Sequence, residues 1–291
     1  VIEGSFRADS LLNFPSPRAQ KVAVIASDNA LLPNPAPVTT SNLSYQQIKS
    51  MVKQAIDLIG GISAFIHEGD TVLIKPNIVG AKATGDGENT DIRVVKSIIS
   101  IIYDTYQNKC KIYIGEGSAR SNATMGGEGW IAAGYNKLST DADLKGINFE
   151  LVDLNDEAAK GINLVYVPSK ASLAYPQKGK YWIHKFLTSP NIKLINVPVL
   201  KMHEPGITNA LKNQIGVAAG AKYGWNKVSG GPGGKLIHHA EFTSVYNYKS
   251  WQDEEIVDLC SCINNFTLNV VDALLCLETQ KTLMTGGANQ V

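Results

Sequence analysis

Short apolar runs of strand length alternate in this chain with longer segments whose apolar residues recur at helical spacing. This alternation constrains the fold more than any other feature, because strands separated by helices favour a parallel sheet with covered faces. The apolar runs lie at 21–27, 71–74, 111–115, 148–153, 163–168, 193–200 and 268–273. The sequence therefore predicts an α/β fold with a mixed, largely parallel sheet that is flanked by helices.

Two of the helical segments carry boundary signals. Ser44 is placed to cap a helix that Gly60-Gly61 closes. Thr90 is placed to cap the next helix, "DIRVVKSIISIIYDTY", whose isoleucines and valines form one apolar stripe. Both helices are expected to pack on the sheet. By contrast, residues 1–20 lack periodicity and indicate a surface arm.

The 291 residues suffice for one sizeable core, and residues 21–291 are expected to form a single α/β domain. Two long Gly-rich insertions interrupt the pattern, near 118–148 and near 217–250. Loops of this length in a compact domain are usually functional segments. The insertions therefore mark where a binding or catalytic role is expected.

Charge and cysteine content exclude several classes of protein. The formal net charge of +1 gives no basic field for nucleic acid, and no apolar run is long enough to span a bilayer. No C-x-x-C pair occurs, so the chain contains no iron–sulfur ligand motif. Buried helix cysteines are favoured for Cys260 and Cys262 over a metal or redox pair, and a Cys260–Cys276 disulfide is a further alternative in an exported protein.

Polar residues follow several of the predicted strands at the point where each strand ends. These strand-end residues are Lys75, Asn77, Glu116, Ser118, Asp153, Lys201, His203 and Asp272. In open α/β sheets, ligands bind outside the carboxyl ends of the strands. The sequence therefore predicts that these residues surround one shared ligand site.

The segment "NVPVLKMHEPGITNALKNQIG" adds further residues to this expected site. Pro205-Gly206 is placed to begin a helix, on which Thr208 and Lys212 would share one face and Asn209 and Asn213 the adjacent one. Converging lysines with amides suit a phosphate or carboxylate group. The alternative is that the lysines extend over the sheet rim and the asparagines cap turns.

Candidate catalytic and metal-binding residues come from the same strand ends and one insertion. His203 is the preferred general acid or base, with Lys201 beside it at the strand end. Asp153 and Asp272, with His238 and His239 of the second insertion, are the candidate ligands of a divalent metal. Asp272 is equally placed to cap a helix instead.

The motifs "VLIKPNIV", "NTDIRVV", "INVPVLKMHEPGITNALKNQIGV" and "VVDALLCL" together resemble the domain of unknown function 362 family over residues 21–287. This resemblance implies an α/β fold without a settled reaction, ferredoxin-like partners in some relatives, and export of many relatives by the twin-arginine route. It also implies that the family pattern continues beyond the end of this sequence. The site residues that it carries over are Lys75, Asn77, Lys201, His203, Lys212 and Asn213.

Three functions compete at this point. The favoured one is an enzyme that binds a small anionic molecule, with a divalent metal as an optional cofactor. The second is a redox or metal protein that works with a ferredoxin-like partner. The third is an exported, non-catalytic module that assembles with itself or with a surface structure. Export rests on the family resemblance alone, and a cytoplasmic location is the alternative.

Overall fold

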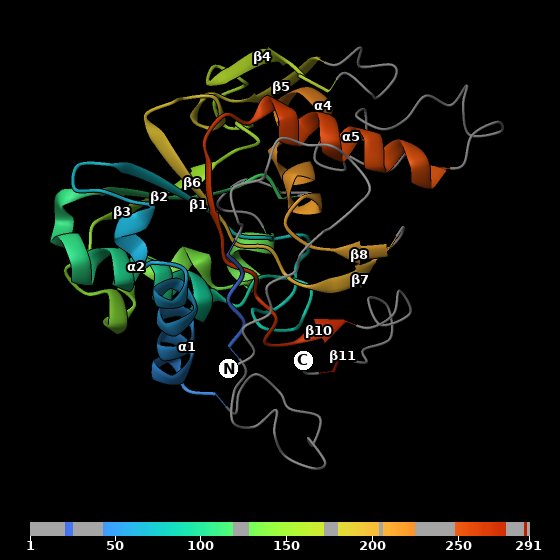
Figure 1. The fold of residues 1–291 in the computed structure, drawn as a ribbon. Coiled ribbons are helices and arrows are strands. Elements are labelled where there is room, and N and C mark those ends of the chain that lie inside the picture. Colours follow the sequence, from blue (N-terminus) through green and yellow to red (C-terminus); the bar gives the residue numbers. More distant parts are fainter. Residues whose placement is uncertain are drawn as a thin grey trace.

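The computed structural model describes residues 21–25, 43–118, 128–171, 180–203, 206–224, 248–277 and 288–289. Its centre is a sheet of five parallel strands in the order β3-β2-β1-β6-β9 (Figure 1). The strands are β1 (Thr71–Lys75), β2 (Lys111–Glu116), β3 (Phe149–Asp153), β6 (Ile192–Asn196) and β9 (Phe266–Asn269). The predicted α/β class, with a largely parallel sheet and flanking helices, is confirmed.

The strand order reverses between β1 and β6. The chain passes from β1 to β2 and β3 on one side, and then places β6 and β9 on the other side. In register, Lys75 at the end of β1 lies beside Asn196 at the end of β6. Ligands of open α/β sheets bind at such a reversal point, at the carboxyl edge. The topology therefore marks the neighbourhood of these two residues for a site.

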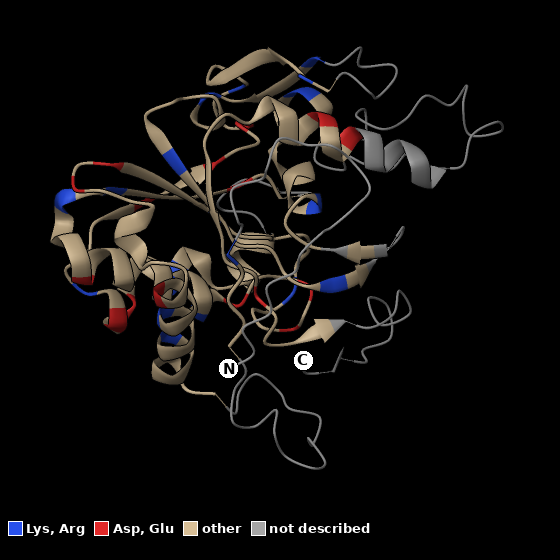
Figure 2. Ribbon diagram, viewed as in Figure 1, with Lys and Arg blue, Asp and Glu red and all other residues tan. Residues whose placement is uncertain are grey.

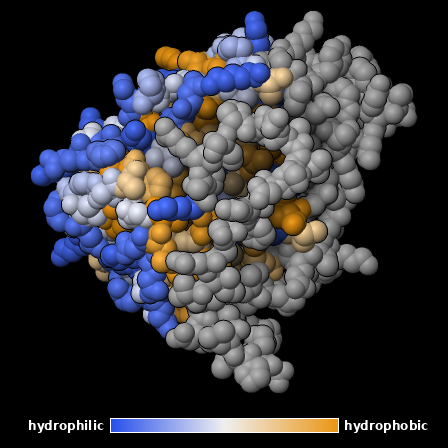
Figure 3. All heavy atoms as spheres, viewed as in Figure 1, coloured by the Kyte–Doolittle hydropathy of each residue, from blue (hydrophilic) through white to orange (hydrophobic). Residues whose placement is uncertain are grey.

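One face of the sheet is covered by α1 (Tyr45–Leu58) and α2 (Ile92–Tyr106), with the short 3-10 turns η3 (Ile62–Ala64) and η4 (Gln107–Lys109) beside them. Ser44 caps α1 as predicted, since its hydroxyl accepts the Gln47 N–H and the Gln47 side chain accepts the Ser44 N–H. Acidic and basic residues are interspersed along the elements of this helical side (Figure 2), and hydrophilic residues dominate its outer surface (Figure 3).

The opposite face is covered by an antiparallel hairpin, β4 (Leu164–Pro168) with β5 (Lys180–His184), and by several short elements. These elements are η7 (Lys185–Leu187), η8 (Lys212–Val217), α4 (Gly220–Tyr223) and α5 (Tyr248–Cys262). Their core contains Leu73, Leu194, Tyr181, Ile183 and Leu259. The run at 163–168 is therefore a strand, as predicted, but it belongs to this hairpin and not to the main sheet.

Three further elements, α3 (Glu128–Ala132), η5 (Tyr135–Thr140) and η6 (Ala142–Leu144), lie between β2 and β3 in sequence and contribute Trp130, Tyr135, Leu138 and Leu144 to the core under α1 and α2. The remaining elements are β7 (Lys201–His203), β8 (Gly206–Thr208), β10 (Cys276–Leu277) and β11 (Ala288–Asn289). The strands β7 and β8 pair as an antiparallel hairpin. The prediction of a helix beginning at Pro205-Gly206 is therefore wrong, because Gly206–Thr208 is a strand that pairs with Lys201–His203.

Other boundary predictions also need correction. Residues 21–25 form no strand, because no neighbouring strand pairs with them in the described structure. The side chains of Val22 and Val24 are therefore exposed. The strand expected at 193–200 stops at Asn196, and Val199 makes only an isolated bridge with Asp272. The expected arm at 1–20 lies outside the described residues, as do most of the two Gly-rich insertions.

The cysteines are free thiols. Cys262 is buried at the end of α5 and Cys260 is half-buried, in line with the expectation of helix cysteines in a core. The Cys260–Cys276 disulfide is not formed here. Among the helices in the described ranges, none has both the length and the apolar composition that crossing a bilayer demands.

Residues 76–91, which connect β1 to α2, form an ordered loop at the carboxyl edge. Asn89 holds it from inside, since its side chain accepts the Val79 N–H at 2.8 Å and donates to the Gly80 carbonyl at 3.0 Å. The Thr90 hydroxyl accepts the Asn77 N–H at 2.8 Å and donates to the Val197 carbonyl at 2.7 Å. Thr90 therefore joins the exit of β1 to the exit of β6.

This use of Thr90 explains why the predicted cap of α2 is wrong by one residue. Because the Thr90 hydroxyl is engaged across the sheet, Asp91 caps the helix, and its side chain accepts the Arg93 N–H at 2.9 Å.

We expect Thr90→Val to lower the free energy of unfolding by about 2–4 kcal/mol, because it leaves a buried N–H and a buried carbonyl without partners. Urea unfolding of the two proteins measures this difference. Thr105→Val is the control, since its hydroxyl bonds within α2 at an exposed position, and we expect a change of at most about 0.5 kcal/mol. Equal effects of the two substitutions would contradict the bridging role of Thr90.

Candidate functional site at the carboxyl edge of the sheet

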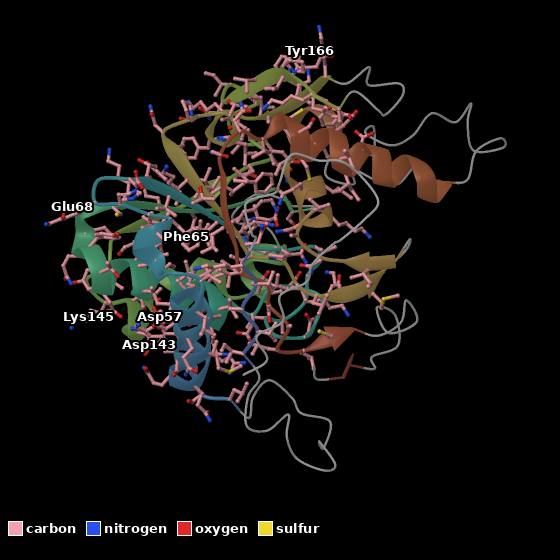
Figure 4. The ribbon with its side chains drawn as sticks, in the orientation of Figure 1. Asp57, Phe65, Glu68, Asp143, Lys145 and Tyr166 are labelled. Atoms are coloured by element: carbon pink, nitrogen blue, oxygen red, sulfur yellow. The ribbon has the colours of Figure 1, made fainter. Side chains whose placement is uncertain are left out.

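Charged side chains such as Glu68 and Lys145 project from the periphery of the molecule (Figure 4), but a second group of polar residues is buried. Most of this group lies at the carboxyl edge of the sheet. The buried polar residues at this edge are Lys75, Asn77, Glu88, Asn89, Thr90, Asp91, Glu116, Ser118, Asn196, Lys201, Asn213, Gln214 and Asp272. Such a concentration of buried polar groups is unusual in a core, because each group must find a hydrogen-bond partner.

The centre of the group is an ion pair between Lys75 and Glu116, at the ends of the neighbouring strands β1 and β2. The Lys75 ammonium is 0% exposed and lies 2.8 Å from one carboxylate oxygen of Glu116 and 3.0 Å from the other. It also donates to the backbone carbonyl of Asn213 at 2.9 Å. Burial lowers the pKa of Lys75, and the Glu116 carboxylate opposes that shift.

Local sequence explains why this pair can form. Pro76 keeps the residue before it extended, which fixes Lys75 at the end of its strand. The Glu116 carboxylate also accepts the N–H groups of Gly117 at 2.7 Å and Ile78 at 3.2 Å. Gly216 of η8 approaches so closely that a Cβ there would lie 2.3 Å from Glu116 Oε1. Only glycine therefore allows η8 to close over the pair.

A chain of amides extends from the ion pair towards the other side of the sheet. The Asn213 side chain donates to Asn196 Oδ1 at 2.7 Å, and Asn196 donates to Asn269 Oδ1 at 2.8 Å. These contacts join η8 to the ends of β6 and β9. The strand ends on both sides of the reversal point thus share one hydrogen-bond network.

Lys201 is the second buried lysine of the site and is 4% exposed. Its ammonium donates to the backbone carbonyl of Glu88, which also accepts the Asn77 side chain at 2.8 Å. Within the described ranges it forms no ion pair with a carboxylate. Burial lowers the pKa of Lys201 to about 8, and the nearby carboxylates of Glu88 and Asp86 only partly oppose this.

Asp272 lies next to the start of α2. Its carboxylate accepts the N–H groups of Asp91 at 2.7 Å and Leu274 at 3.1 Å. Burial, followed by the neighbouring Asp91 carboxylate, raises the pKa of Asp272 to about 7. Asp91 itself has a cationic partner, since Arg93 lies 2.6 Å from it. Asp272 and Lys201 therefore both titrate near neutral pH.

The structure brings together several of the predicted ligand residues. Lys75, Asn77, Glu116, Lys201 and Asn213 all belong to the network, and Ser118 lies two residues after β2. The Lys75 ammonium faces Glu116 and Asn213 inside the protein, and its predicted role in ligand binding stays a prediction.

The other predicted residues are placed differently. Asn209 is half-buried, and its side chain accepts the N–H of Ala210 in a local turn. Lys212 is half-buried at the start of η8, so the expected helical face shared with Thr208 does not exist. Thr208 and His203 are in the β7–β8 hairpin, but their side chains lie outside the described part of the structure.

Two of the four residues predicted to bind a metal, Asp153 and Asp272, lie apart in the described structure. Asp153 ends β3 and Asp272 follows β9, and these are the two outermost strands of the sheet. Asp153 instead accepts the N–H groups of Asn155 and Glu157 in a turn. His238 and His239 lie outside the described residues. Within the described ranges, no three His, Cys, Asp or Glu side chains are grouped to hold a metal ion.

Sequence reasoning missed several residues of the network. An uninterrupted polar run precedes an apolar helix and consists of Glu88, Asn89, Thr90 and Asp91. This run predicts a helix cap, but its hydrogen bonds to the neighbouring strand ends were not predicted. Asn196 lies within an apolar run, and the pattern of that run predicts only a buried strand. Its partners are distant in sequence, so nothing local indicates its role.

Comparisons with known proteins place the chain in a family. No curated protein matches it. A crystal structure of a protein from Thermotoga maritima is similar, with 14% identity, a TM-score of 0.43, and coverage of 79% of this chain and 51% of the other. The chain thus spans about half the length of that protein. The family model described as domain of unknown function (DUF362) matches residues 72–288. The chain belongs to the DUF362 family.

Proposed function

We propose that this protein is an enzyme that binds a small molecule bearing a carboxylate or phosphate group, at the carboxyl edge of the sheet near β1 and β6. The observation that carries the proposal is the state of Lys201. It is a buried ammonium that contacts a backbone carbonyl and, within the described ranges, has no carboxylate partner.

A buried charge without a counter-ion is unfavourable, and an ammonium has three N–H donors to satisfy. The other two cations of the network already have partners, since Lys75 is paired with Glu116 and Arg93 with Asp91. An anionic group of a ligand would supply the missing counter-charge for Lys201. Lys75 would then act as a positioning residue that holds the strand ends in place.

A catalytic role would use the unusual titration of two groups. The pKa of Lys201 is about 8 and that of Asp272 is about 7, so each is poised to gain or lose a proton near neutral pH. This supports proton transfer to or from a bound substrate. His203, the other predicted acid or base, stays a prediction, as do a divalent metal and export.

The redox alternative receives no support from the described cysteines. Burial raises the pKa of both Cys260 and Cys262 to about 12, so their thiols hold their protons at neutral pH. Thiolates are the form that binds metals and exchanges disulfides. The anionic-ligand enzyme is therefore the function that the described residues favour.

We expect Lys201→Met to weaken binding of small anions by about 10- to 100-fold, because a charged hydrogen bond contributes about 1.5–3 kcal/mol. A panel of carboxylates and phosphate esters, measured by thermal shift and calorimetry with and without Mg²⁺, identifies the ligand. Lys111→Met is the matched control, since Lys111 is exposed at the opposite end of β2. If no anion in the panel stabilises the wild-type protein, the proposal is wrong.

We expect anion affinity to be highest below about pH 7 and to fall as the pH rises. Asp272 gains a negative charge as the pH passes about 7, and Lys201 loses its positive charge as the pH passes about 8. Both changes lower the affinity of the site for an anion. Titration with acetate, which is ionised throughout, between about pH 6 and about pH 9 measures the effect. In Lys201→Met the decrease through about pH 8 should vanish, and a flat wild-type profile would contradict this assignment.

A further inference from the structure

Four buried polar groups near the carboxyl edge lack hydrogen-bond partners in the described part of the chain. One of them, Gln214 Oε1, can only accept a hydrogen bond, and the other three can donate one. These three are Ser118 Oγ, Trp130 Nε1 and Tyr135 OH, on residues that are 1%, 0% and 0% exposed. An unpartnered buried polar group costs about 1–3 kcal/mol. Three donors in one region suggest that their partner is a molecule other than the chain itself.

The three groups belong to one run of contacts. Gly129 of α3 approaches Ser118 so closely that a Cβ there would lie 3.1 Å from its hydroxyl. The next residue, Trp130, meets Tyr135 of η5 edge to face, with ring centroids 5.7 Å apart. Thus α3 lies against Ser118, and η5 lies against α3.

This run of contacts reaches the loop that binds Lys201. A Cβ on Gly129 would also lie 3.2 Å from Ile78 and 3.5 Å from the Gly80 carbonyl, and Ile78 donates its N–H to Glu116. The same loop, residues 76–91, supplies the Glu88 carbonyl that accepts Lys201. Burial, together with the nearby carboxylates of Asp91, Asp272 and Glu116, also raises the pKa of Tyr135 well above its usual value.

The chemistry of the three groups indicates what would satisfy them. An indole N–H can only donate, and the two hydroxyls are donors as well. One kind of partner, an acceptor such as an oxyanion oxygen, would satisfy all three. Lys201 has no carboxylate within ion-pair distance among the described residues, but the carboxylates of Glu88, Asp86, Glu116 and Asp272 act on it from farther away. These negative charges disfavour a doubly charged phosphate, so a monocarboxylate meets both requirements better.

We infer that Ser118, Trp130 and Tyr135 form a second wall of the ligand site and donate hydrogen bonds to the oxygens of a small monocarboxylate whose charge faces Lys201. This inference rests on the proposed function and adds its substrate class and three binding residues. Buried water is the competing partner for such groups, and it leads to a different result when a hydroxyl is removed.

The test compares Tyr135→Phe and Ser118→Ala with the wild-type protein, using acetate, lactate and inorganic phosphate as probes at constant ionic strength. Without a probe, we expect Tyr135→Phe to leave the melting temperature unchanged or to raise it by about 2–4 °C, because it removes an unpartnered group. Tyr181→Phe is the control, since the equally buried Tyr181 hydroxyl bonds to Asp258 at 2.8 Å. Its melting temperature should fall by about 2–4 °C.

With the probes, we expect both variants to bind acetate and lactate about 5- to 10-fold more weakly than the wild-type protein, the effect of losing one hydrogen bond. Phosphate should bind the wild-type protein less tightly than the carboxylates do. If Lys201→Met loses binding while Tyr135→Phe and Ser118→Ala retain it, the second wall is wrong and the proposed function stands. If the wild-type protein binds no probe, both fail. A lower melting temperature of Tyr135→Phe without a probe would assign the hydroxyl to a structural water and overturn the inference.

Discussion

The buried ion pair of Lys75 and Glu116 is the interaction on which the carboxyl edge of this sheet depends. The Lys75 ammonium lies 2.8 Å from the Glu116 carboxylate, and this contact joins the ends of β1 and β2. Lys75 also donates to the Asn213 carbonyl, which holds η8 over the point where the strand order reverses. Removing either partner would leave a buried charge unpaired, at a cost of about 3–5 kcal/mol. The pair therefore holds together segments that are far apart in sequence.

The pair also determines which cation is available to a ligand. Because Glu116 pairs with Lys75 and Asp91 pairs with Arg93, Lys201 is the cation of the described network that has no carboxylate within ion-pair distance among the described residues. The amide chain from Asn213 through Asn196 to Asn269 keeps the strand ends rigid around it. A binding group on such rigid elements needs little rearrangement when a ligand arrives, which favours affinity.

Much of the fold was predictable from local patterns. The alternation of apolar runs with helical stripes gave the α/β class, and the Ser44 cap, β1, β2 and β3 lie where the pattern placed them. The strand-end rule also selected Lys75, Glu116 and Lys201, which belong to one hydrogen-bond network in the structure. These successes depend on signals that extend over only a few residues.

The failures concern partners that are distant in sequence. Nothing near Lys75 shows that its ammonium faces Glu116 rather than a ligand. The Thr90 hydroxyl bonds to Val197 in another strand, so the cap of α2 moved to Asp91. Each of Asp153 and Asp272 lies at or after the end of a strand, which predicted that they lie together. Their strands, β3 and β9, are the two outermost strands of the sheet.

A crystal structure of the protein with acetate tests the central claim most directly, because the density of the bound carboxylate shows which cation it contacts. We expect a carboxylate oxygen about 3 Å from Lys201 Nζ, with the Lys75–Glu116 pair unchanged. An anion bound only elsewhere, with Lys201 still donating to the Glu88 carbonyl alone, would contradict the assignment of this edge as the ligand site.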